Sequence, residues 1–328
     1  MYTGKDFNFR LLWGFARKNL FSTFITSLIV VLLYELMGFK FLAIPFVPIA
    51  SVGTAVAFYV GFKNNQAYDR LWEARRLWGS ITNTSRNLSA QMIALVEDKK
   101  VVSDFLTRHI AYVNILRLQL RRTVPWATTK ENLHQNFEGE RTELEEFDAG
   151  LKTILTKHNK MEYYDVLLKK QNTASFILKI QITELTKLKR AKFLDEYEHS
   201  DLVKHINELF NLQGGCERIK TTPLFRQYSI FSRIFVKIFI VLLPFGLLKD
   251  LSALASWGVW LTIPFALLIS WVFYTMEQIG EYSENPFDNS INDIPISAIC
   301  TNIEIDIKEM LGQTDLPAKM QPENDILL

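Results

Sequence analysis

The segment 44–70 constrains this chain most, because it is an apolar run that ends abruptly in a polar, Asn-rich turn. Residues 44–62 contain no charge, and residues 21–37 contain only Glu35. Each stretch is close to the roughly 20 residues with which a helix crosses a bilayer core. The two stretches therefore predict a pair of transmembrane helices, with the polar turn at the end of the second.

A second apolar block, residues 234–276, predicts another helical pair. Lys249 and Asp250 interrupt it, so we expect a short helix over 234–248 and a longer one over 254–276. The chain is 48% hydrophobic, and its apolar residues are gathered into these two blocks. Such clustering is typical of membrane proteins. The expected fold class is an all-α membrane protein with four transmembrane helices.

Basic residues predict the orientation of the spans. They flank the first pair on one side at Lys5, Arg10, Arg17, Lys18, Lys63, Arg70, Arg75 and Arg76. The hairpin inside that pair has only Lys40. By the positive-inside rule, both termini and the middle of the chain are cytoplasmic. Residues 21–37 are too long for a signal-peptide core, and no small-residue cleavage site follows, so we expect them to be retained.

The rest of the chain is expected to be cytosolic. Residues 1–20 form an N-terminal segment, and residues 63–233 form a helical domain, because apolar residues recur there at helical spacing. Breaks are expected at 123–131 and at Gly214–Gly215. Residues 277–311 are predicted to pack on this domain, with a helix over 299–311. The polar tail 312–328 is predicted to be disordered.

Several sequence blocks resemble the bestrophin family of ion channels, in particular its bacterial branch. They are GFKNNQAYDRLWEARRLWGSI (61–81), IPF (44–46), NLQGGCERIKTTPL (211–224) and EQIGEYSENPFDNSINDIPISAICTNIEIDI (277–307). These blocks span almost the whole chain in the expected order, although 124–199 contains no matching motif. The resemblance implies a homopentamer around one central pore in the bacterial inner membrane. It also implies passive conduction of chloride or other monovalent anions or, as in some bacterial members, of monovalent cations such as sodium.

The resemblance places the lining of a narrow pore neck on Thr54, Phe58 and Phe62. Their i, i+4, i+8 spacing independently puts them on one stripe of a helix. Many relatives have a branched aliphatic residue where this chain has Thr54, so we expect the outer end of this neck to be wetter. Without the resemblance, two phenylalanines at this spacing more often pack against helices or face lipid.

Two further parts of the pathway are expected on the cytosolic side. Asn64 and Asn65 follow the span directly and are candidates for the mouth of a vestibule. Asp69 and Arg70 are expected instead to pair with a neighbouring helix. Aligning the chain back from Cys216 places a second, cytosolic aperture near Ser200 and Leu202.

We expect structural roles for the remaining acidic residues, histidines and cysteines that could bind a metal or react. Glu284, Asp288 and Asp293 are too few for a calcium site that needs about 6–8 oxygen ligands. His199 and His205 lie on different helix faces, and Cys216 and Cys300 are expected to be buried thiols. We therefore expect no metal or cofactor.

No catalytic or nucleotide-binding motif occurs, so an enzyme is not expected. The formal net charge of only +2 does not indicate a nucleic-acid partner. The expected partners are inorganic ions, lipid and further copies of the chain. The rival hypothesis is a membrane-anchored scaffold or receptor. A secondary transporter is disfavoured because the two hairpins show no internal repeat.

Overall fold

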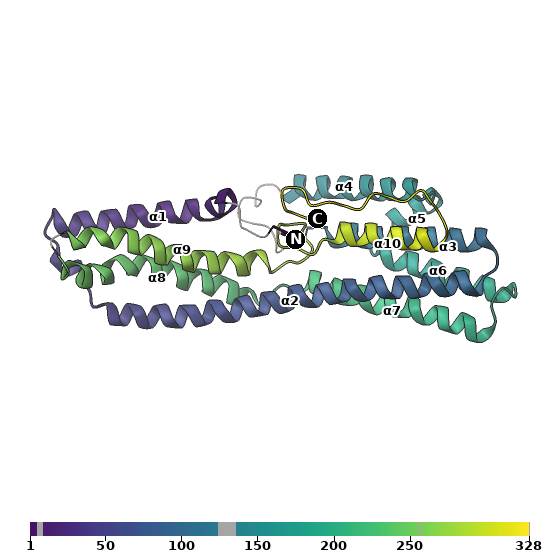
Figure 1. Cartoon of the computed structure of the whole chain (residues 1–328), viewed down its shortest axis with the longest axis horizontal. Coiled ribbons are helices and arrows are strands. Elements are labelled where there is room, and N and C mark those ends of the chain that lie inside the picture. The colour runs from purple at the N-terminus through teal and green to yellow at the C-terminus, as the bar shows by residue number, and fades with distance from the viewer. Residues whose placement is uncertain (5–8, 124–135, 256, 328) are drawn as a thin grey trace. The chain divides into compact units, whose positions relative to one another are not determined.

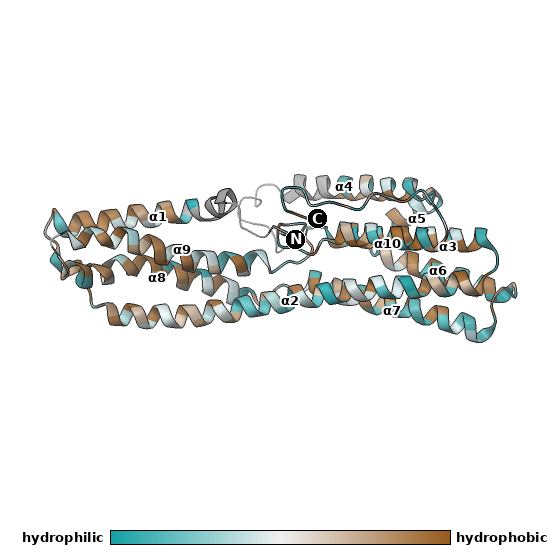
Figure 2. Ribbon diagram, in the orientation of Figure 1, coloured by the Kyte–Doolittle hydropathy of each residue, from teal (hydrophilic) through white to brown (hydrophobic). Residues whose placement is uncertain are grey.

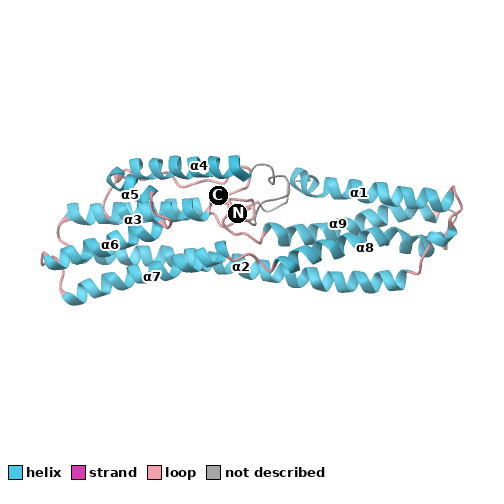
Figure 3. Cartoon of the chain, turned by 180° about the vertical axis from the view of Figure 1, so that it is seen from behind, coloured by secondary structure: helices cyan, strands magenta, loops and turns pink. Residues whose placement is uncertain are grey.

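The computed structural model describes residues 1–4, 9–123, 136–255 and 257–327. These residues are helical almost throughout, and extended pairing among them is confined to isolated bridges near the termini (Figures 1 and 3). The chain divides into two compact units. One comprises Gly4–Arg70 and Leu224–Glu284, and is called the membrane unit below. The other is named the cytosolic unit after the location expected from the sequence, and it comprises Met1–Thr3, Leu71–Pro223 and Asn285–Leu328.

The membrane unit contains the apolar helices (Figure 2). They are α1 (Phe9–Glu35), the first part of α2 (Phe46–Leu95), α8 (Arg226–Ser252) and α9 (Thr262–Tyr282), with short 3-10 turns η1 (Lys40–Leu42) and η4 (Gly258–Leu261). Among the described residues, three segments are long and apolar enough to cross a membrane: Lys40–Leu95, Arg226–Ser252 and Gly258–Tyr282. The apolar part of α1, Asn19–Glu35, is shorter. α1, α8 and α9 pack against one another.

Several helix boundaries differ from the expected ones, and α9, for example, is Thr262–Tyr282 rather than 254–276. α8 begins at Arg226, well before residue 234, and continues through Lys249 and Asp250 to Ser252. Both charged side chains are exposed at the end of the helix, so they are solvated without a break in the backbone. α2 likewise does not stop after the apolar run, and it continues as one 50-residue helix. Nothing between residues 63 and 95 breaks a helix, because that stretch has no proline.

The cytosolic unit is built around α3 (Lys99–Leu120), which packs against four other helices. These are α4 (Asn136–Lys157), α6 (Thr173–Arg190), α7 (Glu196–Thr221) and α10 (Ile296–Met310), while η3 (Met161–Tyr163) and α5 (Tyr164–Leu168) connect α4 to α6. Asp98 caps α3 by accepting from the backbone N–H groups of Lys100 and Val101. A capping box formed by Asp195 and Glu198 begins α7.

The core of this unit is apolar and continuous, and its largest fully buried side chains include Trp78, Tyr112, Phe105 and Phe287. The described part of residues 63–233 is therefore mostly helical, and its cytosolic location stays a prediction. α3 ends at Leu120, and most of the break expected at 123–131, including Pro125, lies outside the described residues.

Another expectation for this unit was wrong. Gly214–Gly215 lies inside α7, and a Cβ on Gly215 would come within 2.9 Å of the Leu77 side chain. That glycine therefore serves close helix packing rather than a turn. In the C-terminal tail, the backbone N–H of Thr3 donates to the Asp325 carbonyl, and Tyr2 forms a bridge with Ile326.

Candidate pore-lining site

The predicted stripe on α2 is exposed in the structure. Thr54, Phe58 and Phe62 are all exposed, the two phenylalanines at 66% and 61%. With Ala57, Gly61 and Asn65 they line an open groove of about 500 Å³. Large apolar side chains left bare in this way indicate a surface that something else covers. Lipid, a second copy and a narrow pore all fit that description.

The opposite face of α2 explains why the stripe points outwards. Ile49, Val56 and Val60 are buried in a cluster with α8 and α9, whose members include Val236, Phe239, Ile240, Leu243 and Ala266. A Cβ on Gly53 would come within 2.6 Å of the Phe239 ring, so only glycine permits this approach. The packing fixes the rotation of α2 about its axis, and that rotation leaves Thr54, Phe58 and Phe62 bare.

The hydroxyl of Thr54 is already used within the helix. Its Oγ1 donates to the Ala50 carbonyl at 3.0 Å. A threonine hydroxyl has one hydrogen to donate and two lone pairs. Thr54 therefore presents acceptor capacity and a methyl group to the groove, without a free donor.

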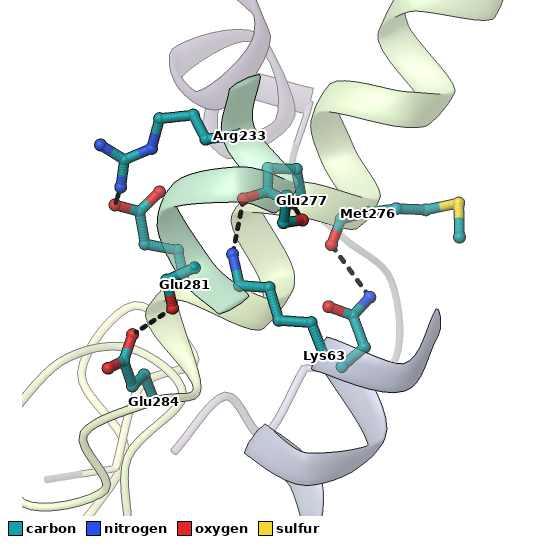
Figure 4. Close-up of polar contacts among 9 residues, drawn as sticks. Lys63, Arg233, Met276, Glu277, Glu281 and Glu284 are labelled. Atoms are coloured by element: carbon teal, nitrogen blue, oxygen red, sulfur yellow. Dashed lines mark hydrogen bonds and ion pairs between the residues drawn. The ribbon is translucent and has the colours of Figure 1, made fainter. Parts of the chain in front are cut away.

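A buried ion pair fixes α2 directly below the stripe (Figure 4). Lys63 is fully buried, and its Nζ lies 2.5 Å from Oε1 of Glu277 on α9, which is 4% exposed. Ser232 of α8 donates its hydroxyl to the other oxygen of the same carboxylate. Both oxygens of Glu277 thus have a donor, as a buried charge requires. The three residues join α2, α8 and α9.

The two asparagines that were expected at the vestibule mouth separate in the structure. Asn65 is exposed and lines the groove below Phe58 and Phe62. Asn64 is half-buried, and its Nδ2 donates to the Met276 carbonyl at 3.0 Å. A Cβ on Gly280 would lie 2.1 Å from Oδ1 of Asn64, so α9 approaches closely here. Asn64 therefore contributes to helix packing, and its place at a vestibule mouth stays a prediction.

Further along α2, the expected contact with a neighbouring segment is present for Arg70. Its Nε donates to the backbone carbonyl of Glu284 at 2.8 Å, whereas Asp69 is exposed. Burial raises the pKa of the Glu284 carboxyl, and the hydrogen bond from Ser229 opposes this shift. Figure 4 also shows Arg233 paired with Glu281 on the surface.

The expected cytosolic aperture is wrong for one of its two residues. Leu202 is fully buried in the core of its own unit, in line on α7 with the buried Ile206 and Leu209. Its side chain therefore belongs to the apolar stripe that holds the helix. Ser200 is exposed.

The acidic residues after α9 have structural partners. Asp288 forms an ion pair with Lys220 at 2.6 Å, and Asp293 accepts from the backbone N–H and hydroxyl of Ser290 at 2.9 and 2.7 Å. Over the described part of the chain, no group of three or more His, Cys, Asp or Glu residues is arranged to hold a metal ion.

The predicted burial of the two thiols is confirmed. Both Cys216 and Cys300 are buried, and burial raises the pKa of each to about 12. His199 lies 3.5 Å from the hydroxyl of Thr186.

Sequence reasoning missed the Lys63–Glu277–Ser232 cluster. The available sign was a lysine directly after an uncharged span and a glutamate directly after the last one. Two such opposite charges at the ends of packed spans can pair, but hydropathy alone does not show which helices are neighbours.

Comparison with known proteins places the chain in a family. Residues 11–309 match the family model described as bacterial/fungal bestrophin protein. The voltage-dependent anion channel-forming protein YneE of Escherichia coli (strain K12) is 30% identical over 309 residues, which cover 93% of this chain and 90% of that protein. The protein of the same name from Salmonella typhi is 29% identical with the same coverage.

A solved structure agrees with this assignment. The crystal structure of a bacterial bestrophin homologue from Klebsiella pneumoniae matches with a TM-score of 0.74 at 26% sequence identity, covering 90% of this chain and 98% of that one. The range matched by the family model, 11–309, includes both apolar blocks and the residues between them. The chain belongs to the bacterial and fungal bestrophin family.

Proposed function

We propose that this chain is the subunit of a passive channel that conducts chloride and other monovalent anions. Its family and the names of its anion channel-forming relatives support this function. The observation that carries the proposal within the chain is the bare stripe of Thr54, Phe58 and Phe62. That stripe lies on a helix whose other face is fixed by α8 and α9.

The channel is a homopentamer in which α2 of each subunit faces the axis. α1, α2, α8 and α9 are the four spans, and both termini are cytosolic in the bacterial inner membrane. Five copies around an axis turn the two exposed phenylalanines into two rings. This arrangement gives the apolar groove on α2 a shared function, because each copy faces the same central space.

The proposed neck acts on ions through ring edges and dewetting. The edge of a phenyl ring carries positive quadrupole charge, so edges that face the axis attract a partly dehydrated anion. Thr54 keeps water at the outer end of the neck, and the exposed amide of Asn65 offers N–H donors at the inner end. The close packing of Gly53 against Phe239 holds α2 against α8, and this fixes the direction in which Phe58 and Phe62 point.

Planar-bilayer recording tests the proposal. Purified wild-type protein should give single-channel currents that reverse close to the chloride equilibrium potential in a salt gradient. Phe58→Ala should raise the conductance several-fold, because it removes the whole ring of phenyl groups at one level. Phe265→Ala truncates another exposed phenylalanine, on α9 and 45% exposed, and should leave the conductance unchanged.

Three results would contradict the proposal. Silence of both wild type and Phe58→Ala would favour the scaffold or receptor hypothesis. Reversal at the cation equilibrium potential would replace anion conduction with conduction of sodium-like cations. Equal effects of Phe58→Ala and Phe265→Ala would remove Phe58 from the neck.

A further inference from the structure

The cytosolic unit contains a cavity of about 590 Å³ that has no part in the proposed neck. It lies between α3, α6 and the turn after α4. Its charged and polar lining includes Lys100, Asp104, Arg108, His158, Lys160 and Glu184. The volume is within the range of about 300–1,000 Å³ that is usual for small-molecule sites.

Two buried cations in this cavity share one carboxylate. Nη2 of Arg108 lies 2.5 Å from Oδ2 of Asp104, and Nζ of Lys160 donates to Oδ1 of the same side chain. The side chains of Arg108 and Lys160 are each 4% exposed, whereas that of Asp104 is 53% exposed. Buried charges are costly unless they are fully paired. One half-exposed carboxylate leaves this pair of cations with a surplus positive charge.

Arg108 also has donors that lack acceptors. Among the described residues, its buried Nε and Nη1 have no hydrogen-bond partner. The centre of its guanidinium lies 5.6 Å from the centroid of the Tyr163 ring. A guanidinium has five N–H donors in its plane and no acceptor. The Arg108 side chain therefore has N–H donors for which additional oxygen acceptors are still needed.

The other titratable groups in the lining do not cancel the surplus. Lys100 adds a further cation, and Glu184 is engaged with Lys187 at 2.8 Å. Burial lowers the pKa of His158 to about 4, so this imidazole is neutral at pH 7. Glu304, which lies near His158, pairs with Lys157 and Lys308. The cavity thus has three cations against two carboxylates.

We propose that this cavity binds a small oxyanion, the carboxylate or phosphate group of a soluble ligand. The oxygens of the anion accept from Lys160 and from the guanidinium of Arg108, the two cations that otherwise share Asp104. Charge-assisted hydrogen bonds of this kind are the strong ones in proteins. Binding is independent of ion conduction, so the site stands or falls separately from the proposed channel function.

Thermal unfolding of the full-length protein in detergent tests the site. Inorganic phosphate and succinate are titrated separately at constant ionic strength, with chloride as the balancing salt. At least one of them should raise the Tm in a saturable way, and the effective one identifies the anionic group. Lys160→Gln should weaken the apparent affinity by 10-fold or more. Lys204→Gln removes the same charge from an exposed pair with Asp201 and should bind as wild type does.

A second variant, which should strengthen anion binding instead of weakening it, separates a binding role from a structural one. Asp104→Asn removes the internal competitor of the anion but keeps both cations. It should lower the Tm of the free protein and tighten the apparent affinity several-fold. Wild type that responds no differently to phosphate or succinate than to chloride would overturn the proposal. So would a response that Lys160→Gln leaves intact, or binding that Asp104→Asn fails to tighten.

Discussion

Thr54 illustrates how one side chain sets the polarity of the proposed neck. Its hydroxyl donates to the Ala50 carbonyl, so only lone pairs and the methyl group remain for the groove. Threonine and valine have nearly the same shape, and exchanging them isolates the effect of the hydroxyl.

We expect Thr54→Val to lower single-channel conductance several-fold, because it makes the outer end of the neck easier to dewet. Planar-bilayer recording measures this change. Thr26→Val is the matched control, because Thr26 makes the same back-bond at 2.9 Å, to the Ser22 carbonyl on α1. A conductance that is unchanged in Thr54→Val would place this residue outside the neck.

His109 gives the cytosolic unit a built-in sensitivity to acid. Its ring is fully buried, with its nitrogens 2.9 Å from the Ser85 hydroxyl and 3.3 Å from the Gln181 amide. Burial lowers its pKa from 6.5 to about 4. At His109, the unfolded chain takes up a proton below pH 6.5, whereas the native protein does so only near pH 4. The free energy of unfolding therefore decreases as the pH is lowered from 6.5 to 4.

The full loss attributable to His109 is on the order of 3 kcal/mol. We expect His109→Gln to make stability decline less steeply between pH 6.5 and pH 4, as measured by denaturant unfolding at a series of pH values. Part of the pH dependence of stability should remain in His109→Gln, because the pKa of His158 is also lowered to about 4. His205→Gln serves as the control, and a slope equal to that of wild type in His109→Gln would refute the assignment.

At the scale of the element, α2 depends on the buried pair of Lys63 and Glu277. Removing one partner leaves a buried charge uncompensated, which typically costs about 3–5 kcal/mol. We expect Glu277→Gln to destabilise the protein by roughly this amount, measured by thermal unfolding in detergent.

Glu281 provides the control one turn later on α9. Its pair with Arg233 is exposed, at 43% and 49%, and exposed pairs contribute about 0–1 kcal/mol. Glu281→Gln should therefore be nearly neutral. Replacing both buried partners, as in Lys63→Met with Glu277→Leu, should recover much of the lost stability. Similar effects of Glu277→Gln and Glu281→Gln would show that burial of the first pair does not matter.

At the scale of the whole molecule, the proposed pentamer brings five copies of Phe58 close to one axis. The native thiols are buried with pKa values of about 12, so they do not react under mild oxidation. We expect Phe58→Cys to form disulfide-linked dimers on oxidation, with a particle mass of five subunits by light scattering. Val241→Cys, at an exposed site on α8, should remain uncrosslinked. A monomeric particle would exclude the pentamer.

The helical class, the apolar blocks and the spacing that aligns Thr54, Phe58 and Phe62 were all predictable from the sequence. These properties follow from local patterns, since hydropathy and helical periodicity are written along the chain. Family motifs then added an expectation about which face matters. They did not fix the helix ends, because a charged residue does not by itself end a helix: Lys249 is exposed, and α8 continues past it to Ser252.

Which side chains stay exposed depends on contacts between helices that are distant in the sequence. Asn64 and Asn65 are neighbours of the same type, and the approach of α9 at Gly280 engages the first and leaves the second exposed. Leu202 is buried because the core of its unit occupies that side of α7. Rotation of a helix about its axis is set by its packing partners, and those partners lie far away in sequence.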